Sequence, residues 1–81
     1  MKVIVKLFAG MAETYGKPSV EIELPPGGTV GDLRRRIVER IAVLSPLMSQ
    51  TLFAADADYV GDDFPLSDGG EVACIPPVSG G

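Results

Sequence analysis

The residues that could most clearly take part in chemistry are the last of the sequence, Pro76-Pro77-Val78-Ser79-Gly80-Gly81. Two consecutive prolines hold a segment extended and keep it from pairing as a strand. Glycine has no Cβ, so a Gly80-Gly81 pair fits a channel that is too narrow for any side chain. The α-carboxylate of Gly81 is ionised at neutral pH, because its reference pKa is about 3.3–3.7. We therefore expect residues 76–81 to form an extended tail that a partner protein can receive.

A carboxylate is a poor electrophile, so group transfer from Gly81 requires activation. One route is an acyl-adenylate made with ATP, whose carbonyl is then attacked by a sulfur nucleophile to leave a C-terminal thiocarboxylate. The sequence has no G-x-x-x-x-G-K-[ST] run to bind ATP. Its glycine pairs, Gly27-Gly28 and Gly69-Gly70, are typical of turns. We expect this chain to bind no cofactor, and ATP to be used by a separate activating enzyme.

The composition argues against an enzyme that acts alone. The 81 residues include no histidine, which removes the commonest general base and a common metal ligand. A single cysteine excludes a disulfide framework. The net charge of −4 makes nucleic-acid binding unfavourable. A single small domain that works through a partner protein is the prediction.

Three other groups of residues are interpreted as structural. Cys74 alternates with Val72 and has no histidine partner, which is typical of a buried cysteine. The aspartates between 56 and 63 lack the spacing of a calcium-binding loop and fit acidic turns. The arginines at 34–36, with Arg40, could dock an acidic partner. A solvated helix face explains them more simply.

Alternating apolar residues predict strands, and a helical repeat predicts one helix. Thr29 is the expected N-cap, with Asp32 three residues later as in a capping box. Ser45-Pro46 should end the helix near residue 44. The run 52–55 reads as a short buried strand. The expected elements are strands over 2–9 and 19–24, a helix over 29–44, and strands over 52–55, 59–60 and 71–75.

A hairpin, one long helix and further strands form the α+β order of the ubiquitin-like β-grasp. This fold is a mixed sheet with one main helix packed on one face, its first and last strands adjacent at the centre. We expect the β-grasp domain to cover residues 1–75 and the tail to cover residues 76–81. The residues expected to face the helix are Val3, Val5, Leu7, Val72 and Cys74.

Strand alternation sends other apolar side chains to the opposite face. If Leu7 and Cys74 point inward, Phe8 and Ile75 point outward at the end of the sheet nearest the tail. Single exposed apolar residues are normal in soluble proteins. Because several cluster here, we interpret them as a partner-binding patch.

The sequence resembles the MoaD/ThiS family of ubiquitin-like sulfur carriers over essentially its whole length, and within it the branch of the molybdopterin synthase small subunit. The segments that carry this resemblance are Leu7-Phe8-Ala9, Val30 to Arg36, Leu66-Ser67-Asp68-Gly69, Glu71-Val72-Ala73 and Ile75 to Gly81.

The resemblance implies a function for the tail. An E1-like adenylating enzyme would activate Gly81, and a sulfur-donating protein would supply the sulfur of the thiocarboxylate. The large subunit of molybdopterin synthase would receive the tail, and the sulfur would pass to cyclic pyranopterin monophosphate in molybdenum cofactor biosynthesis. The residues implied to thread into the large subunit are Pro77, Val78, Ser79 and Gly80, and those implied to contact its surface are Phe8, Tyr59 and Ile75.

Three alternatives stay open. The chain could carry sulfur for thiamine thiazole synthesis, act as a ubiquitin-like modifier joined to lysines through Gly81, or be a docking module with an inert tail. A membrane partner is not expected, because no apolar run approaches the ~20 residues of a membrane span. The N-terminus does not read as a signal peptide, and the cytoplasm is therefore the expected location.

Overall fold

The computed structural model describes residues 1–76, and the predictions for Pro77, Val78, Ser79, Gly80 and Gly81 lie outside the described residues. Its secondary structure has the predicted α+β character. The elements are β1 (Lys2–Leu7), α1 (Gly10–Tyr15), β2 (Ser19–Glu23), α2 (Val30–Arg40), the 3₁₀ helix η1 (Ser45–Gln50), β3 (Leu52–Ala55), β4 (Asp58–Val60) and β5 (Glu71–Ile75).

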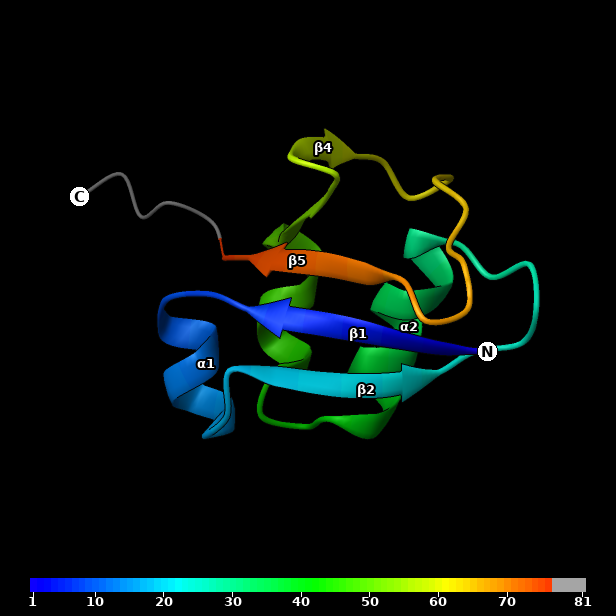
Figure 1. The fold of residues 1–81 in the computed structure, drawn as a ribbon. Coiled ribbons are helices and arrows are strands. Elements are labelled where there is room, and N and C mark those ends of the chain that lie inside the picture. The colour runs from blue at the N-terminus through cyan, green and yellow to red at the C-terminus, as the bar shows by residue number, and fades with distance from the viewer. Residues whose placement is uncertain (77–81) are drawn as a thin grey trace.

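The five strands form one mixed sheet in the order β2-β1-β5-β3-β4 (Figure 1). β1 is antiparallel to β2 and parallel to β5, with Val5 opposite Val72. The prediction that the first and last strands lie together at the centre of the sheet is therefore confirmed. Because β5 is central, the chain that follows it leaves from the middle of the sheet.

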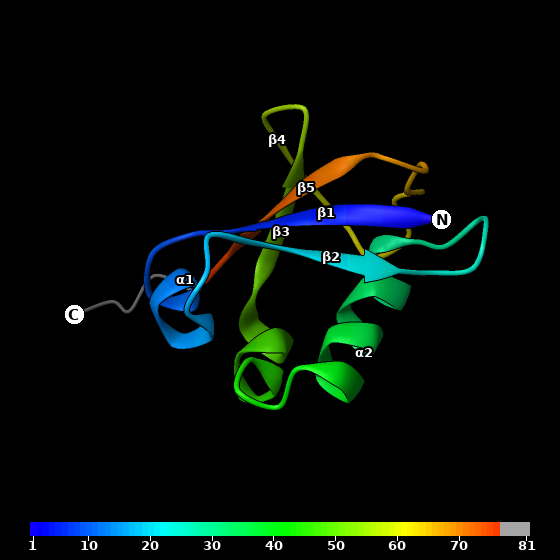
Figure 2. The ribbon, with the colours of Figure 1, turned by 60° about the horizontal axis from the view of Figure 1, so that its bottom comes forward.

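The core lies between the sheet and the two helices, α2 and η1, that cover the same face (Figure 2). The alternating residues of β1 and β5 that were expected to face inward are all buried. The main core residues are Val3, Val5, Leu7, Ile22, Val30, Leu33, Ile37, Leu44, Met48, Phe53, Val72 and Cys74.

The predicted capping box begins α2. The Thr29 N–H donates to Asp32 Oδ2 at 2.9 Å, and the Asp32 N–H donates to Thr29 Oγ1 at 3.3 Å. These two hydrogen bonds satisfy donors that a helix start leaves without partners. The Thr29 N–H and the Thr29 hydroxyl, which donates to Asp32 Oδ2 at 3.2 Å, lower the pKa of Asp32, with a smaller contribution from the guanidinium of Arg35.

The lowered pKa of Asp32 predicts an acid-dependent loss of stability. Its folded pKa lies below the ordinary value of 3.8, so its contribution is present above that value and is lost as the pH falls through the folded pKa. We expect Asp32→Asn to lower the melting temperature at pH 7 and to flatten the decline between pH 5 and pH 2. Thermal unfolding across that range measures both effects, and parallel pH profiles for the two proteins would contradict the expectation.

The predicted end of the helix at residue 44 is wrong. α2 ends at Arg40, and Ile41 leaves helical geometry with φ −123° and ψ 87°. The chain turns there and η1 begins at Ser45, with Pro46 in its first turn. Proline suits the start of a helix, where its missing N–H is not needed. Leu44 keeps its place in the core through this turn.

Arg34 corrects the interpretation of the arginine run as a solvated face. Its guanidinium donates to the carbonyls of Met48 and Thr51, the latter at 2.8 Å, and lies 5.0 Å above the ring centroid of Phe53. It also pairs with Asp62 at 3.0 Å. Arg34 thus ties α2 to η1, β3 and the loop that follows β4.

Candidate functional site

The structure fixes where the predicted tail begins. β5 ends at Ile75, and the half-buried Pro76 follows it directly. The Phe8 N–H donates to the carbonyl of Cys74 at 3.3 Å, so β1 and β5 end side by side (Figure 1). The tail therefore starts next to Phe8, at one end of the sheet.

The outer face of the sheet, opposite the helices, carries an apolar stripe. Strand register places Ala73 of β5 beside Ala54 of β3, and Ala54 beside Tyr59 of β4. In the neighbouring row Ile75 lies opposite Leu52. Cross-strand neighbours on one face are close enough to form a common surface. The apolar stripe consists of Phe8, Leu52, Ala54, Tyr59, Ala73 and Ile75.

The three residues predicted to contact a partner all belong to this stripe. Tyr59 is 68% exposed and Phe8 is 49% exposed, whereas Ile75 is half-buried. They come from β4, the end of β1 and β5, so the sheet gathers residues that lie far apart in the sequence. Their role as partner contacts stays a prediction.

Leu52 is the residue of the stripe that the sequence pattern did not identify. The run 52–55 reads as a buried strand, but of its members Phe53 alone is fully buried, and Leu52 is 51% exposed. Alternation around a buried Phe53 would have sent Leu52 outward. The signal was hidden because all four residues are apolar and the strand is short.

Charged side chains of both signs lie beside the stripe. A shallow hollow of about 270 Å³ beside Phe8 is lined in part by Lys6, Asp56 and Glu71. An apolar centre with a charged rim is the usual anatomy of a protein–protein interface. The partner surface that fits it is apolar with charged residues at the rim.

Comparison with known proteins places this fold and its terminal sequence in a family. The model of the ThiS family matches residues 5–81. The chain belongs to the ThiS family. It is 37% identical over 83 aligned residues to the molybdopterin synthase sulfur carrier subunit of Chlamydomonas reinhardtii, with 100% of both chains covered.

Two solved structures are similar over nearly the whole chain of this family member. The putative molybdopterin converting factor subunit 1 of Pyrococcus furiosus is 33% identical, with a TM-score of 0.81 and coverage of 96% of this chain and 99% of that chain. The small archaeal modifier protein SAMP1 of Haloferax volcanii is 27% identical, with a TM-score of 0.83 and full coverage of both chains. The β-grasp assignment is thereby confirmed.

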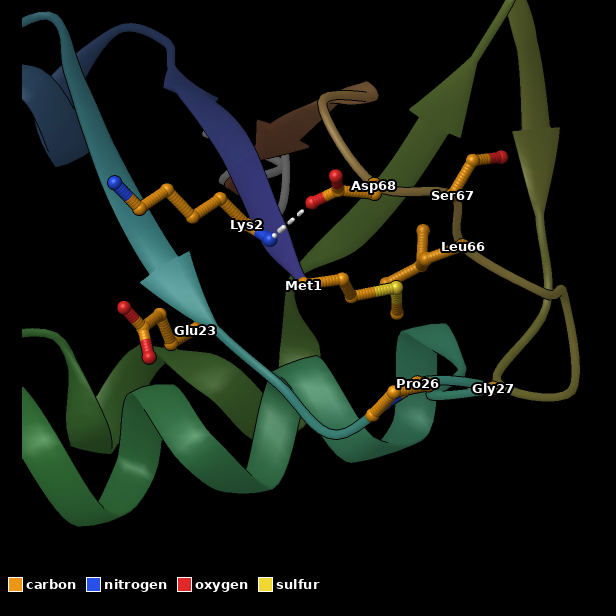
Figure 3. Close-up of a pocket in the computed structure, with 8 residues that line it drawn as sticks. All are labelled: Met1, Lys2, Glu23, Pro26, Gly27, Leu66, Ser67 and Asp68. Atoms are coloured by element: carbon orange, nitrogen blue, oxygen red, sulfur yellow. Dashed lines mark hydrogen bonds between the residues drawn. The ribbon is translucent and has the colours of Figure 1, made fainter.

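A hollow of about 760 Å³ lies at the opposite end of the sheet, where β1 begins (Figure 3). The Lys2 N–H donates to Asp68 Oδ1 there at 2.8 Å, and the Lys2 and Glu23 side chains extend away from Met1 and Leu66 (Figure 3). Its polar groups join two chain segments and do not point together at a place where a ligand could bind. We therefore assign this hollow a structural role.

Two other features, a metal site and a membrane-spanning helix, are absent from the described residues. Within residues 1–76, no three Cys, Asp or Glu side chains are grouped so that they could hold a metal ion. The helices of this part of the chain are all too short and too polar to cross a membrane. The apolar stripe beside the start of the tail is the surface of the described chain that best fits a binding role.

Cys74 is fully buried beneath this surface, as predicted. Its Sγ lies 3.7 Å from Met11 Sδ, and burial raises the pKa of the thiol to about 12. Burial disfavours the thiolate, which is the nucleophilic form. The folded chain therefore keeps Cys74 out of sulfur chemistry.

The raised pKa of Cys74 predicts very slow alkylation of the native protein. A shift from 9.0 to about 12 lowers the thiolate fraction near pH 8 by about 10³-fold, and burial also limits access. We expect iodoacetamide to modify native Cys74 at least ~10²-fold more slowly than the same thiol in guanidinium chloride. Mass spectrometry of timed samples measures the two rates. Equal rates would show that Cys74 is open to solvent.

Proposed function

We propose that this chain is the sulfur carrier subunit of a molybdopterin synthase, with Gly81 as the residue that bears the sulfur. The observation that carries the proposal is the end-to-end similarity to relatives named molybdopterin synthase sulfur carrier subunit. The fold supports it, because the central strand β5 ends beside an exposed apolar stripe. A carrier needs these two features and no catalytic side chains of its own.

The proposed cycle begins at the carboxylate of Gly81. A carboxylate oxygen attacks the α-phosphorus of ATP, pyrophosphate leaves, and an acyl-adenylate results. A sulfur nucleophile at the oxidation level of sulfide then attacks the carbonyl carbon, and AMP leaves with the electron pair of the broken C–O bond. The product is a thiocarboxylate, whose sulfur is passed to cyclic pyranopterin monophosphate. Hydrolysis at the carbonyl returns the carboxylate of Gly81.

Each step is assigned to a partner. An E1-like adenylating enzyme binds and uses the ATP, a sulfur-donating protein supplies the sulfur, and the large subunit of molybdopterin synthase accepts the tail. We propose that the apolar stripe contacts the large subunit while Pro77, Val78, Ser79 and Gly80 thread into it. The glycine pair suits a narrow channel, since it presents no Cβ to the walls. The cytoplasm is the proposed setting, because it keeps a lone cysteine thiol reduced.

A second candidate function is that of a protein modifier. It is favoured by the similarity to SAMP1, the small archaeal modifier protein, whose chain is covered in full. The same acyl-adenylate would serve, because a lysine amine of a target can attack the carbonyl and form an isopeptide bond. The two functions share the activation step and differ in the nucleophile that follows.

Intact-mass spectrometry of the protein isolated from its native cell tests the proposal. We expect a fraction of the chains to carry one oxygen-for-sulfur exchange, located at Gly81 by fragmentation. That fraction should grow when the large subunit is deleted, because the sulfur is then not consumed. A carrier for thiazole synthesis would not respond to that deletion. Unmodified chains together with Gly-Gly remnants on target lysines would instead support the modifier.

A further inference from the structure

The free edge of the sheet at β2 is a second surface with binding potential. β2 pairs with β1 on one side and is the outermost strand of the sheet. The Met1 ammonium donates to the Leu24 carbonyl at 2.7 Å, and the Leu24 N–H donates to the Met1 carbonyl at 2.9 Å. Hydrogen-bonded pairs alternate along an antiparallel ladder. The backbone groups of Glu21 and Glu23 therefore point away from β1, toward the free edge.

A groove of about 390 Å³ runs between this edge and α2. Arg36 donates to the Glu23 carbonyl at 3.1 Å, which closes one end of the edge and leaves the N–H and C=O of Glu21 open. Arg40 forms no ion pair with any carboxylate of residues 1–76. The apolar part of the groove consists of Tyr15, Val20, Ile22 and Ile41. Its charged lining is Arg36 and Arg40 on the helix side and Glu21 and Glu23 on the edge strand.

These features specify the chemistry of an occupant. An open strand edge is a template for a further strand, and the side chains of that strand alternate between two faces. Side chains on the groove side would meet apolar residues and the guanidinium of Arg40, which favours aliphatic groups and a carboxylate. Side chains on the other face would lie beside Glu21 and Glu23, which favours neutral or basic groups.

We propose that the groove between β2 and α2 binds an extended, partly acidic segment of a partner protein by strand addition. The site is separate from the surface of the proposed function: β1 lies between β2 and β5, and the apolar stripe spans β5, β3 and β4 on the outer face, with Phe8 at the end of β1. A segment in the groove would therefore leave the stripe and the tail free. The chain could then hold one partner at β2 while another receives Gly81.

A blocked synthetic peptide tests the proposal on the full-length chain. Every second residue of the peptide is threonine, and the residues between the threonines are aspartate, valine, valine and aspartate in that order. When the peptide is extended, these four residues therefore share one aliphatic and acidic face. We expect NMR titration to shift the amide signals of residues 19–23 and 36–41. A control peptide with lysine in place of both aspartates should bind roughly 5-fold more weakly or worse, because it meets Arg40 with like charge.

Three variants locate the site. Glu21→Pro removes the N–H that faces the free edge but spares the ladder to β1, where edge proline is tolerated. We expect it to weaken peptide binding roughly 10-fold or more, while Glu21→Thr, which keeps the N–H, binds normally. Arg40→Glu should weaken peptide binding roughly 5-fold. This variant replaces Glu21→Pro as the test of the site if the proline variant does not fold. Absence of binding, or shifts confined to the outer face of the sheet, would overturn the proposal.

Discussion

Deleting Gly81 should abolish sulfur transfer while leaving the fold unchanged. The deletion makes Gly80 the terminal residue and draws the reactive carbonyl back by one residue, at most ~3.6 Å along an extended chain. Displacement of a reacting group by about 1 Å can already cost about 10²-fold in rate. We therefore expect at least a ~10²-fold loss of molybdopterin formation in a reconstituted synthase. The melting temperature should stay unchanged, because the core is built from residues that precede Pro76.

A variant with one additional glycine after Gly81 is the matched control for this deletion. It retains every native residue and also ends in Gly-Gly, but the carbonyl now overshoots by the same distance. Both variants should still bind the large subunit through the apolar stripe, and both should fail in transfer. Full activity of the truncated chain would refute the carrier function, because the reactive group would then not be the carbonyl of Gly81.

Phe8→Asp should weaken binding to the large subunit by at least about 2 kcal/mol, or roughly 30-fold in Kd. Phe8 lies beside the end of β5, where its N–H donates to the Cys74 carbonyl, and the residue is half exposed. Burying a carboxylate at an apolar contact costs free energy unless it is paired, and the hollow beside Phe8 already holds two carboxylates, Asp56 and Glu71, against one cation, Lys6. Calorimetry or surface plasmon resonance with the isolated large subunit measures the change.

Val43→Asp provides the control, because Val43 is 54% exposed and lies between α2 and η1, on the helix side of the sheet. It should leave the affinity unchanged. Both variants should keep their melting temperatures within about 5 °C of the native chain, as exposed sites usually do. A large drop for Phe8→Asp would identify Phe8 as a core residue, and equal affinity losses for the two variants would remove the special role of the stripe.

Much of the fold could be predicted because its signals are local. Alternation over 71–75 identified β5 with its observed bounds, and Thr29 with Asp32 marked the start of α2. The end of α2 was missed because the helical repeat continues through Leu44, and burial of Leu44 in a turn satisfies the same pattern. The repeat reports which residues are buried, and it does not report which backbone geometry buries them.

The binding surfaces, in contrast to the helices and strands, depend on contacts between residues that are distant in the sequence. Phe8, Tyr59 and Ile75 could be named in advance, but the sheet register made them neighbours and added Leu52. The sequence predicts Arg34 to be a surface charge. In the structure, its guanidinium donates to the carbonyls of Met48 and Thr51, at and just after the end of η1. These contacts join residues that are distant in the sequence, so no local pattern records them.

The sequence by itself determined which residue types are available for chemistry: it has no histidine, one cysteine and a Gly-Gly pair at positions 80 and 81, where we propose that the carboxylate is activated. These properties belong to residue types and their order, and folding does not alter them. Only the tertiary structure decided which surfaces these residues share. Parallel pairing of β1 with β5 sets the end of β5 beside Phe8, and the strand order leaves β2 open at the far edge. Both depend on hydrogen bonds between strands that are far apart in the chain, which form only when the sheet closes over its core.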